Sequence, residues 1–386
     1  MTPNQAQVTV FIPTFNRLPK LQRAVASVRQ QGNFLHLHIL DNASTDGTGG
    51  WLKELSQEMP NLELTLRENN EGALQNIAQG FDAVRTPYVV PLADDDELAP
   101  GFLESALRIA VEQADLGAVI FKTESRRDGE TLEWSPPDAK PGRREASEHL
   151  IEWAEHGHYV SWSSILWRTE SFARIAPATQ LQRFGMISDV WMQFLIFADC
   201  AVFLVDQPGS IFHIHAEQWS RKMGPDSIMM VGRMVREMDR VLGESGVLTG
   251  EERRRFLSNV CLRFNAMVGH QCQQVSPVPE DAKLREWLDA YLELVYPHVG
   301  FAKFPLFPLF EEYRVMKEAL DTAGSALHKQ DARLREQGAW LQELQVRSDN
   351  LERIENSLTW RLCKHIRSAE DAGKRCLGRR PKTSLP

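Results

Sequence analysis

Residues 8–122 alternate between short apolar runs and amphipathic segments, and this alternation restricts the possible fold more than any other feature. Runs rich in β-branched and aromatic residues predict strands, and apolar residues at helical spacing predict the helices between them. The expected strands are 8–13, 36–40, 62–66, 88–92 and 118–122, and the expected helices are 21–31, 49–57, 73–84 and 102–113. Such strand–helix alternation with short connections predicts an α/β fold with a mostly parallel, doubly wound sheet.

A run of acidic residues, Asp-Asp-Asp-Glu at 94–97, follows the expected strand 88–92. Right-handed crossovers would bring this run to the same sheet edge as the polar loops 14–17 and 41–46. Ligands of open α/β sheets bind beyond the carboxyl ends of the strands, and carboxylates there can hold a cation that in turn holds phosphate. A solvated turn rich in aspartate is the alternative interpretation.

Composition indicates a globular protein large enough for two domains, or for one large domain with appendages. Of 386 residues, 42% are apolar and 25% are charged. Five scattered cysteines argue for a reducing compartment and against both a disulfide framework and a structural zinc site. The N-terminus lacks the basic and long apolar segments of a signal peptide. We therefore expect a cytoplasmic protein that is at most peripheral at a membrane.

The net charge of −8 is unevenly distributed along the chain. Residues 359–386 contain eight Lys or Arg and two acids, so this tail carries +6 and the remainder −14. The acidic body argues against a nucleic-acid partner, whereas the basic tail could contact anionic lipid headgroups.

The second half of the sequence predicts further α/β structure and then helices. Residues 124–142 are polar and rich in Pro and Gly, which indicates a surface loop or lid. A helix over 147–155, a helix from Asp189 to Asp199, strands over 201–205 and 210–215, and helices from 225 onward are expected. Over 311–358, leucines recur every seven residues at 320, 327, 334 and 341, then at 344, 351 and 358. This spacing predicts a weak coiled coil that could form a homo-oligomer, or a long helix packed on the body.

Four segments, at 13–17 (Pro-Thr-Phe-Asn-Arg), 40–48, 70–72 followed by Asn76, and 91–100, carry a specific resemblance. In order and spacing they resemble the nucleotide-sugar domain of family 2 glycosyltransferases, which have the GT-A fold. The resemblance covers residues 8–215 and implies a nucleotide diphosphate-sugar donor. The residues implied in donor binding are Pro13, Thr14, Phe15, Arg17, Asp41, Asn42, Asn70, Gly72, Asn76 and Asp94.

Two positions of this donor site depart from the family pattern. Asn42 stands where an aspartate more commonly contacts uracil, so the identity of the base stays open, because an amide both donates and accepts. Ala93 occupies the first position of the common Asp-x-Asp spelling. Asp41 would orient the loop, and Phe15 would offer its ring to the base.

The resemblance also implies a divalent metal, Mn²⁺ or Mg²⁺, which would neutralise the charge developing on the diphosphate. Asp94 would face the ribose and Asp95 would bind the metal. His215 is the preferred second ligand, although His213 alternates with it on a strand. Asp96 is a further candidate ligand in view of Ala93.

In the acceptor half, Asp189 resembles the family's general base, which deprotonates the attacking sugar hydroxyl so that a single displacement inverts configuration. The alternative for Asp189 is a helix cap. Trp162 and Trp191 are candidates for stacking on the acceptor sugar, with burial in the core as the alternative.

The predicted function is a metal-dependent inverting glycosyltransferase acting on a glycan or lipid-linked acceptor of lipopolysaccharide or O-antigen synthesis. A nucleotidyltransferase and a non-catalytic coiled-coil scaffold are the alternatives. The tail around Trp360 resembles the ending of some surface-polysaccharide glycosyltransferases and could lie on the inner leaflet or pack on a partner. The expected organisation is a GT-A domain at 1–222 (nucleotide-sugar half 8–122, acceptor half 145–222), a helical region at 223–308, a coiled-coil helix at 309–358 and a basic amphipathic tail at 359–386.

Overall fold

A computed structural model describes residues 7–32, 35–136, 140–157, 160–175, 177–215, 227–273 and 348–350 of the chain. The chain divides into two compact units. The first contains residues 1–222 and 238–256, and the second contains 223–237 and 257–386. The predicted coiled coil and the basic tail lie outside the described residues, apart from 348–350, which are helical.

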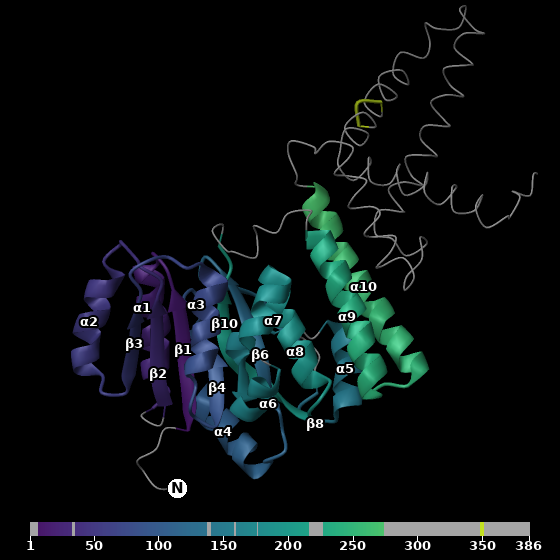
Figure 1. Cartoon of the computed structure of the whole chain (residues 1–386), viewed down its shortest axis with the longest axis horizontal. Helices are drawn as coiled ribbons and strands as arrows, with labels where there is room; N and C mark the ends of the chain where they lie inside the picture. Colours follow the sequence, from purple (N-terminus) through teal and green to yellow (C-terminus); the bar gives the residue numbers. More distant parts are fainter. Residues whose placement is uncertain are drawn as a thin grey trace, which may run out of the picture. The chain divides into compact units, whose positions relative to one another are not determined.

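The described strands form one sheet in the order β3-β2-β1-β4-β9-β6-β10-β5, with β7 paired to β6 and β8 to β10. They are β1 (Val8–Thr14), β2 (Leu35–Asp41), β3 (Leu62–Leu66), β4 (Tyr88–Pro91), β5 (Glu97–Leu98), β6 (Ala118–Arg127), β7 (Glu130–Ser135), β8 (Gly142–Arg144), β9 (Ile165–Arg168) and β10 (Val202–His213). Strands β3, β2, β1 and β4 are parallel, and the first three lie side by side in Figure 1. Strand β9 is antiparallel to both of its neighbours. The predicted α/β fold is confirmed: β3, β2, β1 and β4 form a parallel block, and β6 and β10 form a further parallel pair.

Helices connect the strands and cover the sheet. They are α1 (Leu18–Arg29), α2 (Thr48–Glu58), α3 (Ala73–Ala83), α4 (Phe102–Glu112), α5 (Ala146–His156), α6 (Thr169–Arg174), α7 (Pro177–Phe184), α8 (Ser188–Phe197), α9 (Ser227–Ser245) and α10 (Gly250–Gln273). Helix α1 shows the common pattern: a proline in its first turn favours initiation, and an apolar stripe containing Leu21, Val25 and Val28 is buried in the core. In the described part of the chain no helix is both long and apolar enough to cross a membrane.

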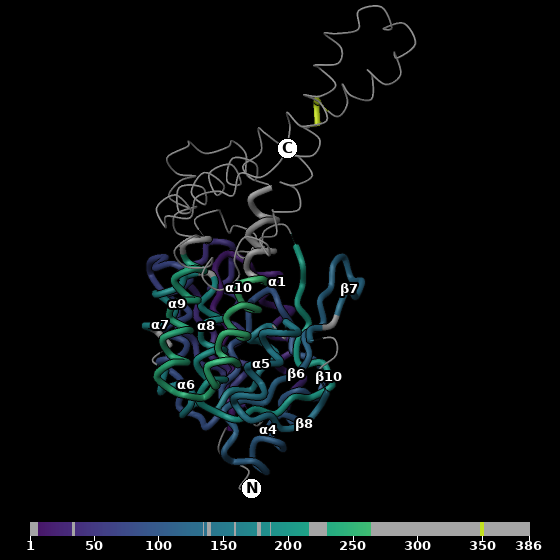
Figure 2. The backbone as a smooth tube through the Cα atoms, turned by 90° about the vertical axis from the view of Figure 1, so that its right-hand side faces the viewer, coloured from purple at the N-terminus to yellow at the C-terminus, as the bar shows by residue number. Residues whose placement is uncertain are grey.

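The prediction of a surface loop or lid at 124–142 is wrong for most of this segment. Strand β6 continues to Arg127, and β7 pairs antiparallel with it. The turn between them is Asp128-Gly129, with φ of 52° and 86°. Positive φ at both central residues belongs to the tight hairpin turn that Asp-Gly favours, since its twist matches that of the strands. Figure 2 shows this hairpin extending from one side of the first unit.

The two strands predicted at 201–205 and 210–215 are one strand, β10, whose pairing with β6 shifts register around Pro208. Proline lacks the N–H needed for a regular ladder, so it coincides with the irregularity. Gly209 lies against β6 so closely that a Cβ there would stand 2.6 Å from the Phe121 Cβ. Pairing with β6 resumes after the bulge and continues to His213. Phe212 and His213 therefore lie at the end of β10, on the sheet edge where the site lies.

Candidate active site

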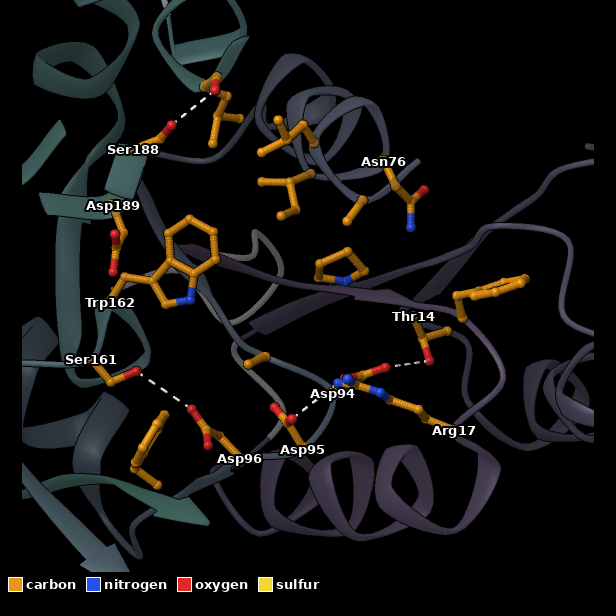
Figure 3. Close-up of a pocket in the computed structure, with 18 of the residues that line it drawn as sticks. Thr14, Arg17, Asn76, Asp94, Asp95, Asp96, Ser161, Trp162, Ser188 and Asp189 are labelled. Atoms are coloured by element: carbon orange, nitrogen blue, oxygen red, sulfur yellow. Dashed lines mark hydrogen bonds and ion pairs between the residues drawn. The ribbon is translucent and has the colours of Figure 1, made fainter. Parts of the chain in front are cut away.

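A pocket of about 780 Å³ opens beyond the carboxyl ends of β1, β2 and β4. Its walls combine residues from the parallel half of the sheet with residues from the β6–β7 hairpin and from α8. Figure 3 shows Thr14 and Asp94 of the first group and Asp189 of α8. The predicted site residues that line it are Pro13, Thr14, Phe15, Arg17, Asn42, Asn70, Gly72, Asn76, Asp94, Asp95, Asp96, Trp162 and Asp189. Asp41, Trp191 and His215 are not among its lining residues.

The proposed base region is held by amide side chains that are already oriented by hydrogen bonds. Asn42 Nδ2 donates to Asn70 Oδ1 at 2.7 Å, and Asn42 Oδ1 accepts from the Glu71 main-chain N–H at 2.9 Å. Asn76 Nδ2 donates to the Leu40 carbonyl at 2.8 Å. The ring of Phe15 is 39% exposed, so an aromatic face is available next to these fixed amides.

Asp41 is buried at the end of β2 and acts within the loop that follows it. Its carboxylate accepts hydrogen bonds from the main-chain N–H and the hydroxyl of Ser44. Ser44 Oγ in turn accepts from the Asn16 N–H at 2.8 Å, and Asn16 has a φ of 51°. These contacts tie the loop after β1 to the loop after β2, consistent with an orienting role for Asp41.

Asp94 is buried and held from two sides, as Figure 3 shows. The Thr14 hydroxyl donates to Asp94 Oδ2 at 2.8 Å, and Arg17 Nη1 donates to Asp94 Oδ1 at 2.9 Å. Burial raises the pKa of Asp94 to about 6, although the Arg17 charge opposes this shift. With its oxygens engaged in this way, Asp94 joins the first strand of the sheet to the acidic loop.

Two side-chain nitrogen atoms lie within hydrogen-bonding distance of Asp95 Oδ2. Arg17 Nη1 lies 2.9 Å from it and His215 Nε2 lies 3.0 Å from it. The Lys20 ammonium is 3.3 Å from the same histidine nitrogen. His215 therefore reaches the pocket through Asp95 although it does not line the pocket itself.

His213, the alternative to His215, has a different partner. Its Nε2 lies 2.7 Å from Glu97 Oε1, and burial lowers the pKa of His213. Arg23 Nε contacts the same glutamate oxygen at 3.0 Å. The structure thus places His215, rather than His213, against Asp95.

Asp96 is almost fully buried beneath the pocket. Its Oδ2 accepts from the hydroxyls of Ser161 and Ser163 at 3.4 and 3.3 Å. Burial first, and then the charge of Asp95, raise the pKa of Asp96 well above its ordinary value. Its contacts connect the acidic loop to the short helix at Trp162–Ser164, from which Trp162 lines the pocket.

Asp189 lies in the first turn of α8 and points into the pocket next to Trp162 (Figure 3). The N-cap position of this helix is Ile187, so Asp189 is not the capping residue. Ser188 fixes the preceding turn, because its hydroxyl donates to the carbonyls of Leu181 and Gly185 at 2.8 and 2.7 Å. Desolvation raises the pKa of Asp189 to about 6, which suits a carboxylate that accepts a proton near neutral pH.

The two tryptophan candidates separate in the structure. Trp162 is half-buried, lines the pocket and has the edge of Phe81 against its ring, with 6.3 Å between the ring centroids. Trp191 is 1% exposed, packs against Phe184 and Phe194 and donates its Nε1–H to Gln180 Oε1 at 2.7 Å. Trp191 is a core residue of α8, so nothing in the structure supports its predicted contact with an acceptor.

Several residues at the site were missed by sequence reasoning. Arg67 is buried after β3 and donates from Nε to Asn76 Oδ1 at 3.1 Å, which helps to orient that amide. The β6–β7 hairpin contributes four polar side chains to the pocket, Thr123, Ser125, Glu133 and Ser135. The Asp-Gly dipeptide between alternating strands could have revealed the hairpin, whereas no local pattern marks Arg67.

Comparison with known proteins agrees with this architecture. Residues 9–184 match the profile of the family described as Glycosyl transferase family 2. A stretch of 109 residues is 32% identical to the GalNAc(5)-diNAcBac-PP-undecaprenol beta-1,3-glucosyltransferase of Campylobacter jejuni. This alignment covers 28% of the chain and 35% of the relative, so the chain spans about a third of the length of that relative.

The fold is also similar to crystal structures of S. aureus TarS. Residues 1–349 of TarS superpose with a TM-score of 0.59 at 14% identity, over 78% of this chain and 85% of that one. The same segment in complex with UDP-GlcNAc gives a TM-score of 0.60 at 13% identity, over 78% and 82%. At these identities the likeness concerns the fold.

The sheet order, the acidic loop after β4 and the pocket at the carboxyl ends of the parallel strands define an α/β protein of the GT-A class. Within that class, residues 9–184 match the model of glycosyltransferase family 2, the family that the four sequence segments predict.

Proposed function

We propose that the chain is a metal-dependent inverting glycosyltransferase that transfers a sugar from a nucleotide diphosphate-sugar to a glycan or lipid-linked acceptor. One observation carries this proposal. A single pocket is lined by the acidic loop with Asp95 on one side and by the half-buried Asp189 on the other. His215, which does not line the pocket, lies against Asp95 at 3.0 Å. These are the two chemical functions that the reaction needs, a site for the leaving diphosphate and a base for the attacking hydroxyl.

The nucleoside would bind between the Phe15 ring and the oriented amide of Asn42. Asn42 Oδ1 and Nδ2 each use one hydrogen-bonding position within the protein, which leaves one acceptor and one donor position for a base. This pattern suits the adjacent N–H and carbonyl of uracil. The TarS structure with bound UDP-GlcNAc supports a uridine nucleotide as the first donor to test.

The residues beside the acidic loop fit a divalent cation. Asp95 Oδ2 and His215 Nε2 lie 3.0 Å apart, and a carboxylate and an imidazole are groups that would hold such a cation together. Among the residues that the structure describes, no group of three or more His, Cys, Asp or Glu side chains suits a metal. The proposed ion would therefore take its other ligands from water and phosphate, as Mg²⁺ commonly does, and would neutralise the leaving diphosphate.

Arg17 would support the same step as a cation of the protein itself. It is the basic residue among the described side chains that line the pocket, and it contacts both Asp94 and Asp95. Five acidic residues share this lining: Asp94, Asp95, Asp96, Glu133 and Asp189. An anionic diphosphate placed in such a pocket needs a positive charge beyond Arg17, which is the electrostatic argument for a metal.

Asp189 would act as the general base. Its carboxylate takes the proton of an acceptor hydroxyl while that oxygen bonds to the anomeric carbon of the donor sugar. The bond from the anomeric carbon to the diphosphate oxygen breaks in the same step, so the configuration inverts and the nucleoside diphosphate leaves. A pKa of about 6 leaves Asp189 ionised at neutral pH and able to hold the proton during the reaction.

The proposed acceptor is a lipid-linked sugar. The name of the Campylobacter relative, which refers to an undecaprenol-linked substrate, supports a lipid-linked acceptor. We place the reaction in lipopolysaccharide or O-antigen synthesis at the inner membrane, with the basic tail on the inner leaflet and the leucine repeat as an oligomerisation helix. Removal of residues 359–386 should abolish binding to vesicles that contain anionic lipid, and unchanged binding would point to a protein partner instead.

A panel of nucleotide sugars tests the catalytic proposal, with thermal unfolding measured in the presence and absence of Mn²⁺. A ligand that binds only the folded state at 100 times its Kd stabilises that state by about 2.7 kcal/mol. We expect a uridine diphosphate-sugar to raise Tm with Mn²⁺ and to be slowly hydrolysed. Stabilisation by none of the panel, together with no hydrolysis, would contradict the proposal.

A further inference from the structure

The β6–β7 hairpin has two faces with different chemistry. Side chains alternate along paired strands, so residues two apart share a face. Ser125 pairs with Glu133 and Thr123 pairs with Ser135, and all four of these residues line the pocket. Thr123 Oγ1 is engaged within the protein, because it accepts from the Ser161 N–H at 2.9 Å and shares a hydrogen bond with Ser164 Oγ at 2.8 Å. The hairpin therefore presents chiefly the Ser125 hydroxyl and the Glu133 carboxylate to the pocket.

The opposite face of the hairpin is neutralised within itself. Arg126 donates from Nε and Nη2 to the two oxygens of Glu124 at 2.6 and 2.9 Å, and Thr131 donates to the same carboxylate. None of these three residues lines the pocket. Thr131 lies on this face although it is two residues from Glu133, because the pairing of the strands shifts register between Ser125 and Arg126. The ion pair with Glu124 neutralises the Arg126 charge outside the pocket lining.

Glu133 differs from Glu124 in lacking such a partner. The Glu133 carboxylate has no hydrogen bond or ion pair with any side chain that the structure describes, and the residue is exposed. It faces the same cavity as Asp189 and Trp162. Since Arg17 forms ion pairs with Asp94 and Asp95, the described residues that line the pocket include no further basic side chain to pair with Glu133 or Asp189.

A saccharide fits this arrangement better than other ligands do. The Trp162 ring, supported by Phe81, offers an apolar face for the C–H groups of a pyranose. Carboxylate and hydroxyl oxygens on the hairpin can accept hydrogen bonds from sugar hydroxyls. A phosphate, sulfate or uronic acid carboxylate in the same place would face unneutralised negative charge.

We propose that the β6–β7 hairpin forms an acceptor subsite that selects an uncharged sugar, with Glu133 and Ser125 binding its hydroxyls opposite Trp162. This inference rests on the proposed glycosyltransferase function and adds the substrate class. It assigns to Glu133 two effects, attraction of hydroxyl donors and exclusion of anionic acceptors. The terminal unit of the acceptor is then a neutral hexose or N-acetylhexosamine rather than a uronic acid or a phosphorylated sugar.

The test uses the full chain and the nucleotide sugar that stabilises it in the panel described above. It measures transfer to matched soluble acceptors: glucosides, galactosides and N-acetylhexosaminides, and the corresponding uronides. The wild type should use a neutral member at least tenfold better than its uronide, judged by kcat/KM. Glu133→Gln should raise KM for the neutral acceptor about tenfold, the value of one hydrogen bond to a charged group. Glu133→Lys should reduce the ratio of neutral to uronide transfer by at least tenfold.

Glu130→Gln and Glu130→Lys are the matched controls, because Glu130 lies on the same strand but does not line the pocket. Both should keep the wild-type ratio. The inference is overturned if the wild type prefers uronides, if it uses no neutral member of the panel, or if Glu133 variants behave like Glu130 variants. Wild-type protein that hydrolyses no donor would instead contradict the proposed function, so the two failures are distinguishable.

Discussion

The proposed donor side of the pocket, with Asp94 and Asp95, and the proposed acceptor side, with Asp189, use the same kind of side chain in opposite electrostatic settings. On the donor side, Asp94 and Asp95 share Arg17, with 2.9 Å to each carboxylate. On the acceptor side, Asp189 has no side-chain hydrogen-bond or ion-pair partner among the described residues. Burial raises the pKa of both Asp94 and Asp189 to about 6, so burial alone does not separate them. Their side-chain partners distinguish the two residues. A carboxylate paired with a positive charge is suited to hold a cation, whereas one without such a partner is suited to accept a proton.

Asp189→Asn should have the largest effect of the variants that test this contrast. An amide keeps the size of the side chain but cannot take the hydroxyl proton, so transfer should fall by about 10²–10⁴-fold. Stabilisation by the donor should persist, because the donor side is untouched. Kinetics of transfer and donor-dependent Tm are the measurements.

Asp199→Asn is the control for this variant, since Asp199 follows the other end of α8, is exposed and pairs with Arg174. It should leave transfer unchanged. If Asp189→Asn instead abolished donor binding and lowered Tm, Asp189 would be a structural residue.

Asp95→Ala should impair the proposed binding of metal and donor. Removal of the carboxylate takes away one proposed metal ligand and the partner of His215, so Mn²⁺ affinity should fall and turnover should drop by about 10²–10³-fold. Electron paramagnetic resonance of Mn²⁺ measures binding without relying on activity. Asp115→Ala, which removes an exposed acid paired with Arg143 away from the pocket, should change neither quantity. Equal Mn²⁺ affinity in both variants would refute the metal assignment.

Stability as a function of pH gives a smaller effect with a definite sign. The folded-state pKa of Asp189 lies about two units above the unfolded value of 3.8, so the folded protein holds the proton more tightly. Ionisation of Asp189 therefore reduces the free energy of unfolding as pH rises from 4 to above 6, by at most about 3 kcal/mol.

The Asn variant at position 189 lacks this penalty. Its free energy of unfolding relative to the wild type should increase between pH 4 and pH 8, as measured by urea denaturation at each pH. A difference that does not change with pH would show that desolvation at this site is weak.

Thr14→Val should have the smallest effect. It removes the hydroxyl that donates to Asp94 and should lower stability by about 1 kcal/mol, with a modest loss of donor affinity. Thr9→Val on the same strand loses a similar hydrogen bond, to Thr86, and should lower stability without changing donor affinity. Equal donor affinities in the two variants would remove Thr14 from the binding site.

Local sequence patterns were sufficient for the elements that depend on near neighbours. The alternation of apolar and amphipathic segments predicted the parallel half of the sheet, and the acids at 94–97 were placed correctly at its carboxyl edge. The family assignment also followed from short ordered segments, since each segment lies in one loop. The same local view missed the Asp128-Gly129 turn and treated the hairpin as a lid.

Contacts between distant parts of the chain were decided by the tertiary structure. Trp191 is kept out of the pocket by the packing of α8 against α7, where its Nε1–H donates to Gln180. The pairing of His215 with Asp95 depends on the register shift in β10, which sets where that strand ends. The partner of Arg17, 77 residues away, could not be read from its neighbours. The sequence by itself determined which chemical groups stand at the strand ends. The tertiary structure decided which of them are neutralised, because burial and charge pairing are properties of three-dimensional neighbours.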